Sequence, residues 1–198
     1  PSMIRPFIFF AIATTLSMTA PIDPLEKVPA EYRGLANATL QVLEAIPQEY
    51  KDKAKTFIEG IPRSELISAL SLLQGYHKYD NDDEFLADIK EHTPAVYSKF
   101  LEAKTLLNER LAHLTPKAHT WLKEYAIKCK KMAVESMKGT TATPADLMAL
   151  VLETTLDYAL LSPEDLASFD KAFPELAALE KDPEMEKLMN NVVANLMM

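Results

Sequence analysis

Five times in this chain, a residue that can cap a helix stands directly before a proline. The pairs are Thr93-Pro94, Thr115-Pro116, Thr143-Pro144, Ser162-Pro163 and Asp182-Pro183. A Ser, Thr or Asp oxygen accepts a hydrogen bond from a free N–H of the first helical turn, and proline at the first position loses no bond. Pro47, Pro62 and Pro174 open helical patterns without such a residue. The prolines therefore predict a series of helices that meet at short joints.

The spacing of apolar residues is helical along the whole chain, and no segment alternates with period two. We expect helices over residues 35–46, 47–60, 62–76, about 82–92, 94–114, 116–138, 144–161, 163–173, 174–181 and 183–198. The pattern predicts an all-α fold: a single domain of many short and a few long helices that enclose an apolar interior.

Composition narrows the classes of partner and chemistry. The net charge is −8, with a pI near 5.1, which argues against nucleic acid and against anionic membranes as main partners. A single cysteine, Cys129, rules out a disulfide framework and is expected to be a small buried side chain. The chain has no phosphate loop, nucleophile elbow or catalytic triad, so we expect no enzyme and no cofactor.

No metal site is expected either. The histidines lack the spacing of metal ligands. Acidic residues at positions 80, 82, 84 and 91 match four positions of a calcium loop, but Phe85 stands where that loop needs glycine.

The amino-terminal region has the layout of a secretory signal. After Met3 come Arg5, an apolar run from Phe7 to Leu16, and small or polar residues up to Ala20. The run is too short to span a membrane. We expect a signal over residues 3–20, a mature domain over 21–198 and secretion. The alternative is an extra helix packed on the core. If the chain is exported, Asn37 is an N-glycosylation candidate, although its motif also occurs by chance within helices.

Four positions match the pattern that acid-directed kinases prefer, a Ser or Thr with an acid three residues later. They are Thr56, Thr143, Thr154 and Ser162. The same pattern caps helices, and capping is the favoured interpretation. Ser162 is the phosphorylation candidate.

Two helical segments, 62–76 and 144–161, carry apolar residues around most of their circumference. Such a helix is either wholly buried or has one face on the core and another on an apolar cavity. Periodicity alone leaves a solid core and a hollow interior both open.

Several short elements follow one another in a distinctive order. They are Ile46-Pro47-Gln48-Glu49, Asp82-Asp83-Glu84-Phe85-Leu86, Thr93-Pro94-Ala95-Val96-Tyr97-Ser98-Lys99, Leu114-Thr115-Pro116-Lys117-Ala118-His119-Thr120-Trp121-Leu122, Leu161-Ser162-Pro163-Glu164-Asp165 and Phe173-Pro174-Glu175-Leu176. Together they resemble the nematode fatty-acid- and retinol-binding protein family over about residues 46–196. One element departs from the family's pattern. The run Ile61-Pro62-Arg63-Ser64-Glu65 lacks the acid that the family often has three residues after the residue at this position.

The resemblance implies non-catalytic, extracellular binding and transport of fatty acids and retinol in an internal hydrophobic cavity. The further expectations are a monomer, transient membrane contact during ligand exchange, and a ligand carboxylate near Lys99, Arg110 or Lys128. The expected lining is Phe100, Leu107, Leu111, Leu122, Tyr125, Met132, Leu147, Leu150, Val151 and Leu156. The alternative is a helical protein-interaction module with a solid core.

Overall fold

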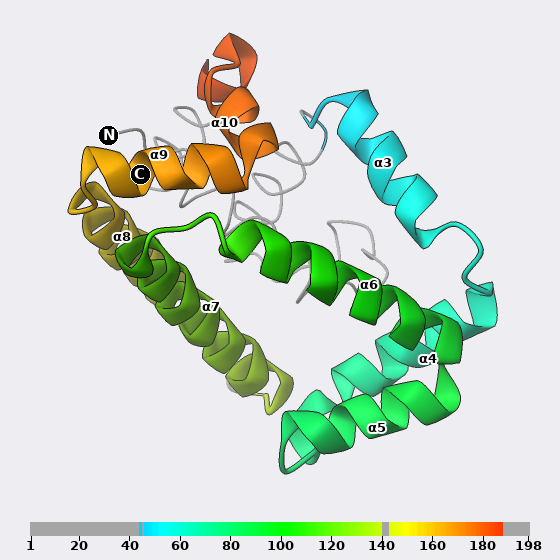
Figure 1. The fold of residues 1–198 in the computed structure, drawn as a ribbon. Helices are drawn as coiled ribbons and strands as arrows, with labels where there is room; N and C mark the ends of the chain where they lie inside the picture. The colour runs from blue at the N-terminus through cyan, green and yellow to red at the C-terminus, as the bar shows by residue number, and fades with distance from the viewer. Residues whose placement is uncertain (1–43, 45, 140–142, 188–198) are drawn as a thin grey trace. The chain divides into compact units, whose positions relative to one another are not determined.

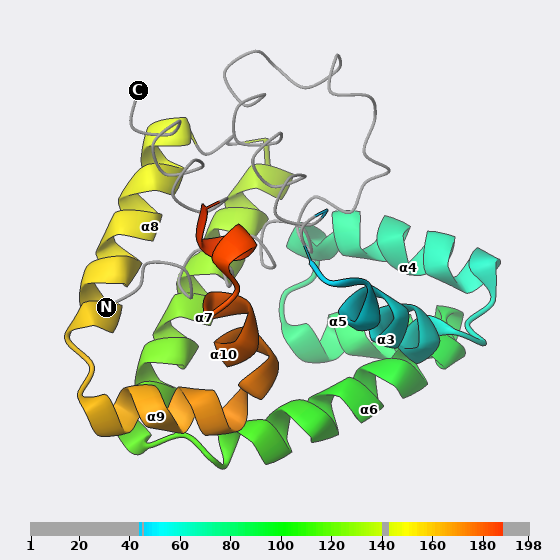
Figure 2. The same cartoon turned by 90° about the horizontal axis from the view of Figure 1, so that it is seen from above.

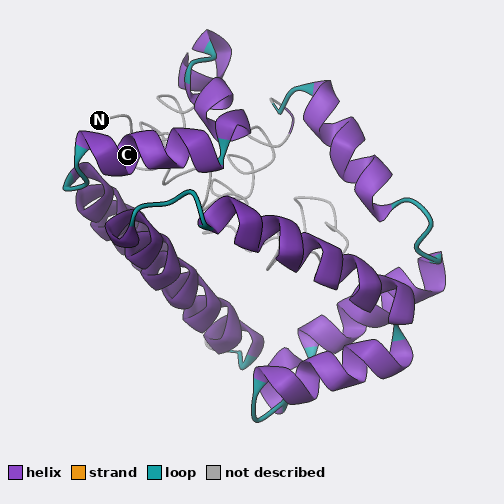
Figure 3. Ribbon diagram, in the orientation of Figure 1, coloured by secondary structure: helices purple, strands orange, loops and turns teal. Residues whose placement is uncertain are grey.

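The computed structural model describes residues 44, 46–139 and 143–187, and their regular structure is helical, with no strand among them (Figure 3). The elements are α3 (Gln48–Ile58), α4 (Arg63–Gln74), the 3₁₀ helix η2 (Tyr76–Lys78), α5 (Asp82–His92), α6 (Pro94–Leu111), α7 (Pro116–Met137), α8 (Pro144–Ala159), α9 (Pro163–Ala172) and α10 (Pro174–Glu180) (Figure 1). Residues 183–187 are helical as well. The all-α prediction is confirmed. The secretory segment, Asn37 and the end of the last expected helix lie outside the described residues.

Four of the five predicted caps are present. The Thr115 hydroxyl accepts a hydrogen bond from the backbone N–H of Ala118 at 3.2 Å. Thr143 and Ser162 each form a capping box with the aspartate three residues later. The Asp182 carboxylate accepts from backbone N–H groups two and three residues on. Capping and proline therefore position these helix starts, as the pattern predicted.

The prediction for Thr93 is wrong. Its buried hydroxyl donates backwards to the carbonyl oxygen of Ile89 at 2.8 Å, at the end of α5. The free N–H groups of Ala95 and Val96 instead donate to a carboxylate oxygen of Glu65 in α4, at 2.7 and 3.4 Å. The start of α6 is thus capped by an acid from another helix, and no local pattern reveals such a cap.

We expect Glu65→Ala to lower the free energy of unfolding by about 0.5–2 kcal/mol, the usual cost of a lost cap. Glu65→Gln keeps an oxygen acceptor and should cost less. Urea denaturation followed by circular dichroism measures both, with the exposed Glu109→Ala on α6 as control. An Ala variant as stable as the unsubstituted protein would show that this cap contributes nothing.

The described chain divides into two compact units. Residues 47–110 and 134–141 form one of them, and here α4 and α5 lie side by side (Figures 1 and 2). The phenols of Tyr76 and Tyr79 donate to the carboxylates of Asp82 and Asp88. Both tyrosine rings meet Phe85 edge-on, with centroids 5.0 and 5.4 Å apart. Aromatic contacts and hydrogen bonds together hold the segment between the two helices, which includes η2, against α5. The prediction of one domain is not tested by this division and stays a prediction.

The acidic stretch before and within α5 forms a helix start. The Asn81 side chain accepts from the backbone N–H of Glu84 at 3.0 Å, and the Glu84 carboxylate accepts from the N–H of Asp80 at 3.2 Å. Negative charge here suits the positive end of the helix dipole. Among the described residues no group of His, Cys, Asp or Glu is placed to hold a metal ion.

The other unit contains residues 111–133 and 142–198, as far as they are described. Its α7 and α8 lie side by side as a hairpin, α9 crosses one end, and α10 packs against α9 (Figure 2). At that end the carboxylate of Asp165, only 6% exposed, accepts hydrogen bonds from the Thr115 hydroxyl and from the hydroxyl and N–H of Ser162. The turn before α7 is thereby tied to the start of α9.

The hydrogen bonds from Thr115, followed by those from Ser162, hold the pKa of the Asp165 carboxyl below its ordinary value. A lowered folded-state pKa contributes stability that is present above the unfolded value of about 3.9 and is lost as the pH falls through the folded value. We therefore expect Asp165→Asn to destabilise the protein at pH 7, and the difference from the unsubstituted protein to shrink in strong acid. Denaturant melts across this pH range test it, with the exposed Asp83→Asn as control. A difference independent of pH would contradict the role of the charge.

Candidate functional site

The α7–α8 hairpin contains two apolar clusters, and the first is closed by aromatic packing. The aromatic cluster consists of Ala118, Trp121, Tyr158, Leu161 and Phe169, all buried. The Trp121 ring lies 5.1 Å from Tyr158 and 5.4 Å from Phe169, centroid to centroid. Rings at these distances fill the space between α7, α8 and α9 as a solid core.

The second cluster lies further along the same hairpin. Tyr125 and Leu150 are buried at its centre, while Cys129, Met132 and Val151 around them are half-buried. We call these five residues the Tyr125 cluster. Four of the ten predicted lining residues are brought together here. A stacked pair of rings, Trp121 and Tyr125, joins the two clusters with centroids 5.7 Å apart.

The Tyr125 cluster presents no charge. Burial raises the pKa of the Tyr125 phenol, and it also raises the pKa of the Cys129 thiol. The phenol hydrogen-bonds to the thiol. On α8, the hydroxyls of Thr154 and Thr155 donate to carbonyl oxygens of their own helix at 2.6 and 2.7 Å. Neutral, mutually satisfied polar groups suit an apolar molecule and offer neither an activated nucleophile nor a general base.

The other predicted lining residues lie elsewhere. Phe100 and Leu107 on α6 are 39% and 46% exposed, and residues 101–109 of this helix are exposed throughout. Leu122 packs on the aromatic cluster, and Leu111 is half-buried. Leu156 is 59% exposed, and helical spacing puts it about 120° around α8 from Leu150. The side chain of Leu147 is outside the described part. The lining role of each of the ten residues stays a prediction.

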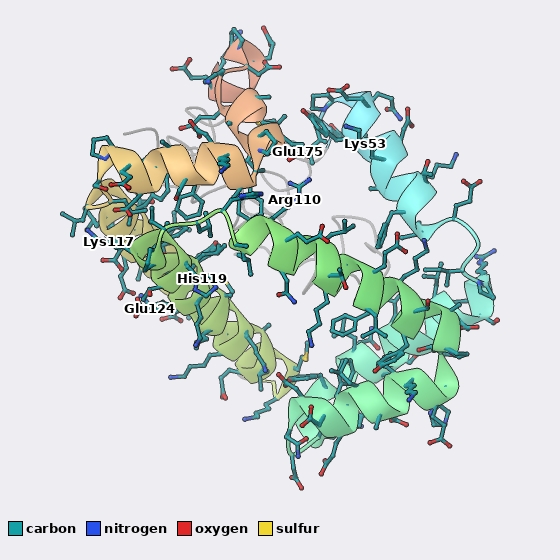
Figure 4. The ribbon with its side chains drawn as sticks, viewed as in Figure 1. Lys53, Arg110, Lys117, His119, Glu124 and Glu175 are labelled. Carbon is teal, nitrogen blue, oxygen red and sulfur yellow. The ribbon has the colours of Figure 1, made fainter. Side chains whose placement is uncertain are left out.

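Two of the three candidate partners for a ligand carboxylate are ion-paired. Lys99 donates to Glu102 at 3.0 Å, and its ammonium lies 4.9 Å from the centre of the Phe57 ring. Lys128 donates to Glu153 at 3.0 Å, and this bond raises the pKa of the lysine. Arg110 lies near the end of α6 (Figure 4). This geometry does not select one of the three.

Sequence reasoning missed the aromatic cluster as a unit. In the sequence, Trp121 is singled out only as part of one family-like element, whereas in the structure it contacts three other rings. The signal was present, because tryptophan buries more apolar surface than most residues and this one lies within a long helix.

Comparison with known proteins now adds to this geometry. Residues 40–192 match the family described as nematode fatty acid retinoid binding protein (Gp-FAR-1). The chain belongs to this family. It is 26% identical to fatty-acid and retinol-binding protein 2 of Caenorhabditis elegans, over 96% of this chain and 100% of that protein. It is 23% identical to fatty-acid and retinol-binding protein 1 of the same species, over 94% of this chain and 97% of that protein.

A solved structure is also similar, that of the fatty acid and retinol binding protein Na-FAR-1 from Necator americanus. The TM-score is 0.52 and the sequences are 24% identical, over 84% of this chain and 97% of the other. This likeness supports the all-helical fold of the family. Across the helices that the structure describes, none combines the length and apolar character needed to cross a bilayer.

Proposed function

We propose that this chain binds fatty acids and retinol and transports them without catalysis, holding the ligand against apolar helix faces in its interior. Membership of the family supports the ligand class. The observation that carries the location is the Tyr125 cluster, which is apolar and uncharged and whose buried centre, Tyr125 and Leu150, is bordered by half-buried side chains.

Burial of apolar surface alone is sufficient for such a site to bind a lipid tightly. Each buried methylene contributes on the order of 0.8 kcal/mol, so a long acyl chain needs few polar contacts for tight binding. In the other unit, the exposed apolar residues of α6, Phe100 and Leu107 among them, form an apolar surface of their own. We propose the ten predicted residues as lining, with Tyr125, Met132, Leu150 and Val151 as its best-supported members.

The finer parts of the proposal rest on the sequence. We expect a monomer, secretion directed by residues 3–20, and transient membrane contact when ligand is exchanged. Ser162 as a phosphorylation site and Asn37 as a glycosylation site are proposed on their motifs alone. In the structure the Ser162 hydroxyl caps α9. The solid-core interaction module is not favoured, because the family to which the chain belongs is a lipid-binding one.

Native mass spectrometry of the purified protein tests the proposal. We expect a fraction of the protein to carry bound fatty acid from the expression host, and delipidated protein to regain mass when oleate or retinol is added. Protein that carries no lipid and takes up neither compound would overturn the proposed function.

A further inference from the structure

The outer side of the α7–α8 hairpin carries apolar side chains that belong to neither cluster. Leu152 and Leu156 on α8 and Leu160, directly after the end of this helix, follow at four-residue spacing and are 56%, 59% and 73% exposed. Leu156 is also a proposed lining residue, so only Leu152 and Leu160 are substituted to test this surface. The buried residues Leu150 and Tyr158 lie on the opposite side of the same helix. A row of leucines on the outside of a helix is unusual, because the outer face of a surface helix is normally polar.

Contacts with α7 show what borders this row. The Lys117 ammonium donates to the carbonyl oxygen of Leu160 at 3.0 Å. Lys128 reaches Glu153 at 3.0 Å and Asp157 at 3.7 Å, on the flank of α8 next to the leucines. Figure 4 shows Lys117 and Glu124 on the same side of α7, with His119 on another side. We call the leucine row, together with Lys117 and the ion pairs of Lys128 that border it, the outer hairpin surface.

The charge of the hairpin differs from that of the chain. Helix α7 has five lysines and two glutamates, a net +3, and α8 has Asp146, Glu153 and Asp157, a net −3. The hairpin helices therefore sum to zero, while the whole chain carries −8. A neutral apolar surface on an acidic protein complements a lipid layer of zero net charge and disfavours an anionic one.

The size of the row argues against a second copy of this chain as its occupant. A stable protein interface buries about 800 Å² on each partner, around 20 residues a side. Three leucines fall far short of that. The same three side chains are enough for shallow, reversible insertion between lipid headgroups, because a single acyl chain already gives marginal membrane binding.

We propose that the outer hairpin surface docks this protein on zwitterionic lipid membranes. This inference rests on the proposed function, since a lipid carrier must exchange ligand with membranes, and it assigns that contact to a defined surface. The Tyr125 cluster lies on the same two helices as this surface. When the surface is docked, the ligand-holding residues are therefore close to the lipid layer.

The test is co-sedimentation with phosphatidylcholine vesicles. We expect the unsubstituted protein to partition onto the vesicles. The double variant Leu152→Gln, Leu160→Gln should bind the vesicles at least about tenfold more weakly. The matched control replaces Ile58 and Ile67 by Gln; these residues are 49% and 56% exposed in the other unit, and we expect no loss. Replacing about one third of the lipid by phosphatidylserine should weaken binding at low salt.

Vesicle-free titration with a fluorescent fatty acid separates this inference from the proposed function. We expect the double variant to bind ligand as the unsubstituted protein does, with an unchanged circular dichroism spectrum. Equal partitioning of variant and unsubstituted protein, or no partitioning at all, would overturn the docking proposal. The docking proposal would also be overturned if sedimentation showed that the unsubstituted protein forms a dimer and the double variant does not, because the surface would then join two copies.

Discussion

Phe169→Ala should lower the free energy of unfolding by about 3–5 kcal/mol. Phe169 is 2% exposed and contacts Trp121 and Tyr158, so its removal leaves a cavity between three helices that are held by ring packing. Chemical denaturation followed by Trp121 fluorescence and by circular dichroism measures the change. A loss this large is a substantial part of the stability of a domain.

A matched control is Leu160→Ala, which removes an apolar side chain that is 73% exposed and should shift stability by less than about 0.5 kcal/mol. Phe169→Leu should fall between the two, because it retains part of the volume. A Phe169→Ala loss below about 1 kcal/mol would mean that the aromatic cluster collapses easily around the gap and is not a rigid core.

Val151→Trp should weaken ligand affinity about tenfold or more while leaving the stability of the delipidated protein little changed. Val151 is half-buried beside Tyr125 and Leu150, so the indole would occupy space that we assign to ligand. In a filled core the larger side chain has no such space, and overpacking would cost about 1–3 kcal/mol. Denaturant melts and a titration with a fluorescent fatty acid on the same sample distinguish the two cases.

Leu152→Trp is the control for this experiment. It adds the same side chain at the next residue of α8, where the native leucine is 56% exposed on the outer side. We expect no change in ligand affinity in solution. Clear destabilisation of Val151→Trp with unchanged affinity would reject Val151 as lining.

The positions of the helices followed from the sequence because they depend on local chemistry. Proline at the first helical position and a capping side chain before it act within one turn, so α8 and α9 start where Thr143-Pro144 and Ser162-Pro163 predicted. The cap of α6 was mispredicted because its acceptor, Glu65, is 30 residues away in the chain. Local patterns carry no information about such a partner.

The candidate site was predictable only in part, for a related reason. Helical periodicity groups residues on one face of a helix, and Tyr125 and Met132 share such a face of α7. Periodicity does not say which helix meets that face. Leu156, which we predict as lining together with Val151, is 59% exposed, and periodicity does not say what covers such a side chain. Helices apolar all round, such as α8, are where this ambiguity is greatest.

The central claim is that retinol or fatty acid lies against the Tyr125 cluster, and energy transfer from Trp121 to retinol tests it most directly. Trp121 is the only tryptophan of the chain, and it stacks on Tyr125 with ring centroids 5.7 Å apart. When retinol is added to delipidated protein, we predict saturable quenching of Trp121 emission with matching sensitised emission from retinol, both reversed by excess oleate. Saturable binding of retinol without transfer would place the ligand away from this cluster, and the absence of any binding would contradict the account as a whole.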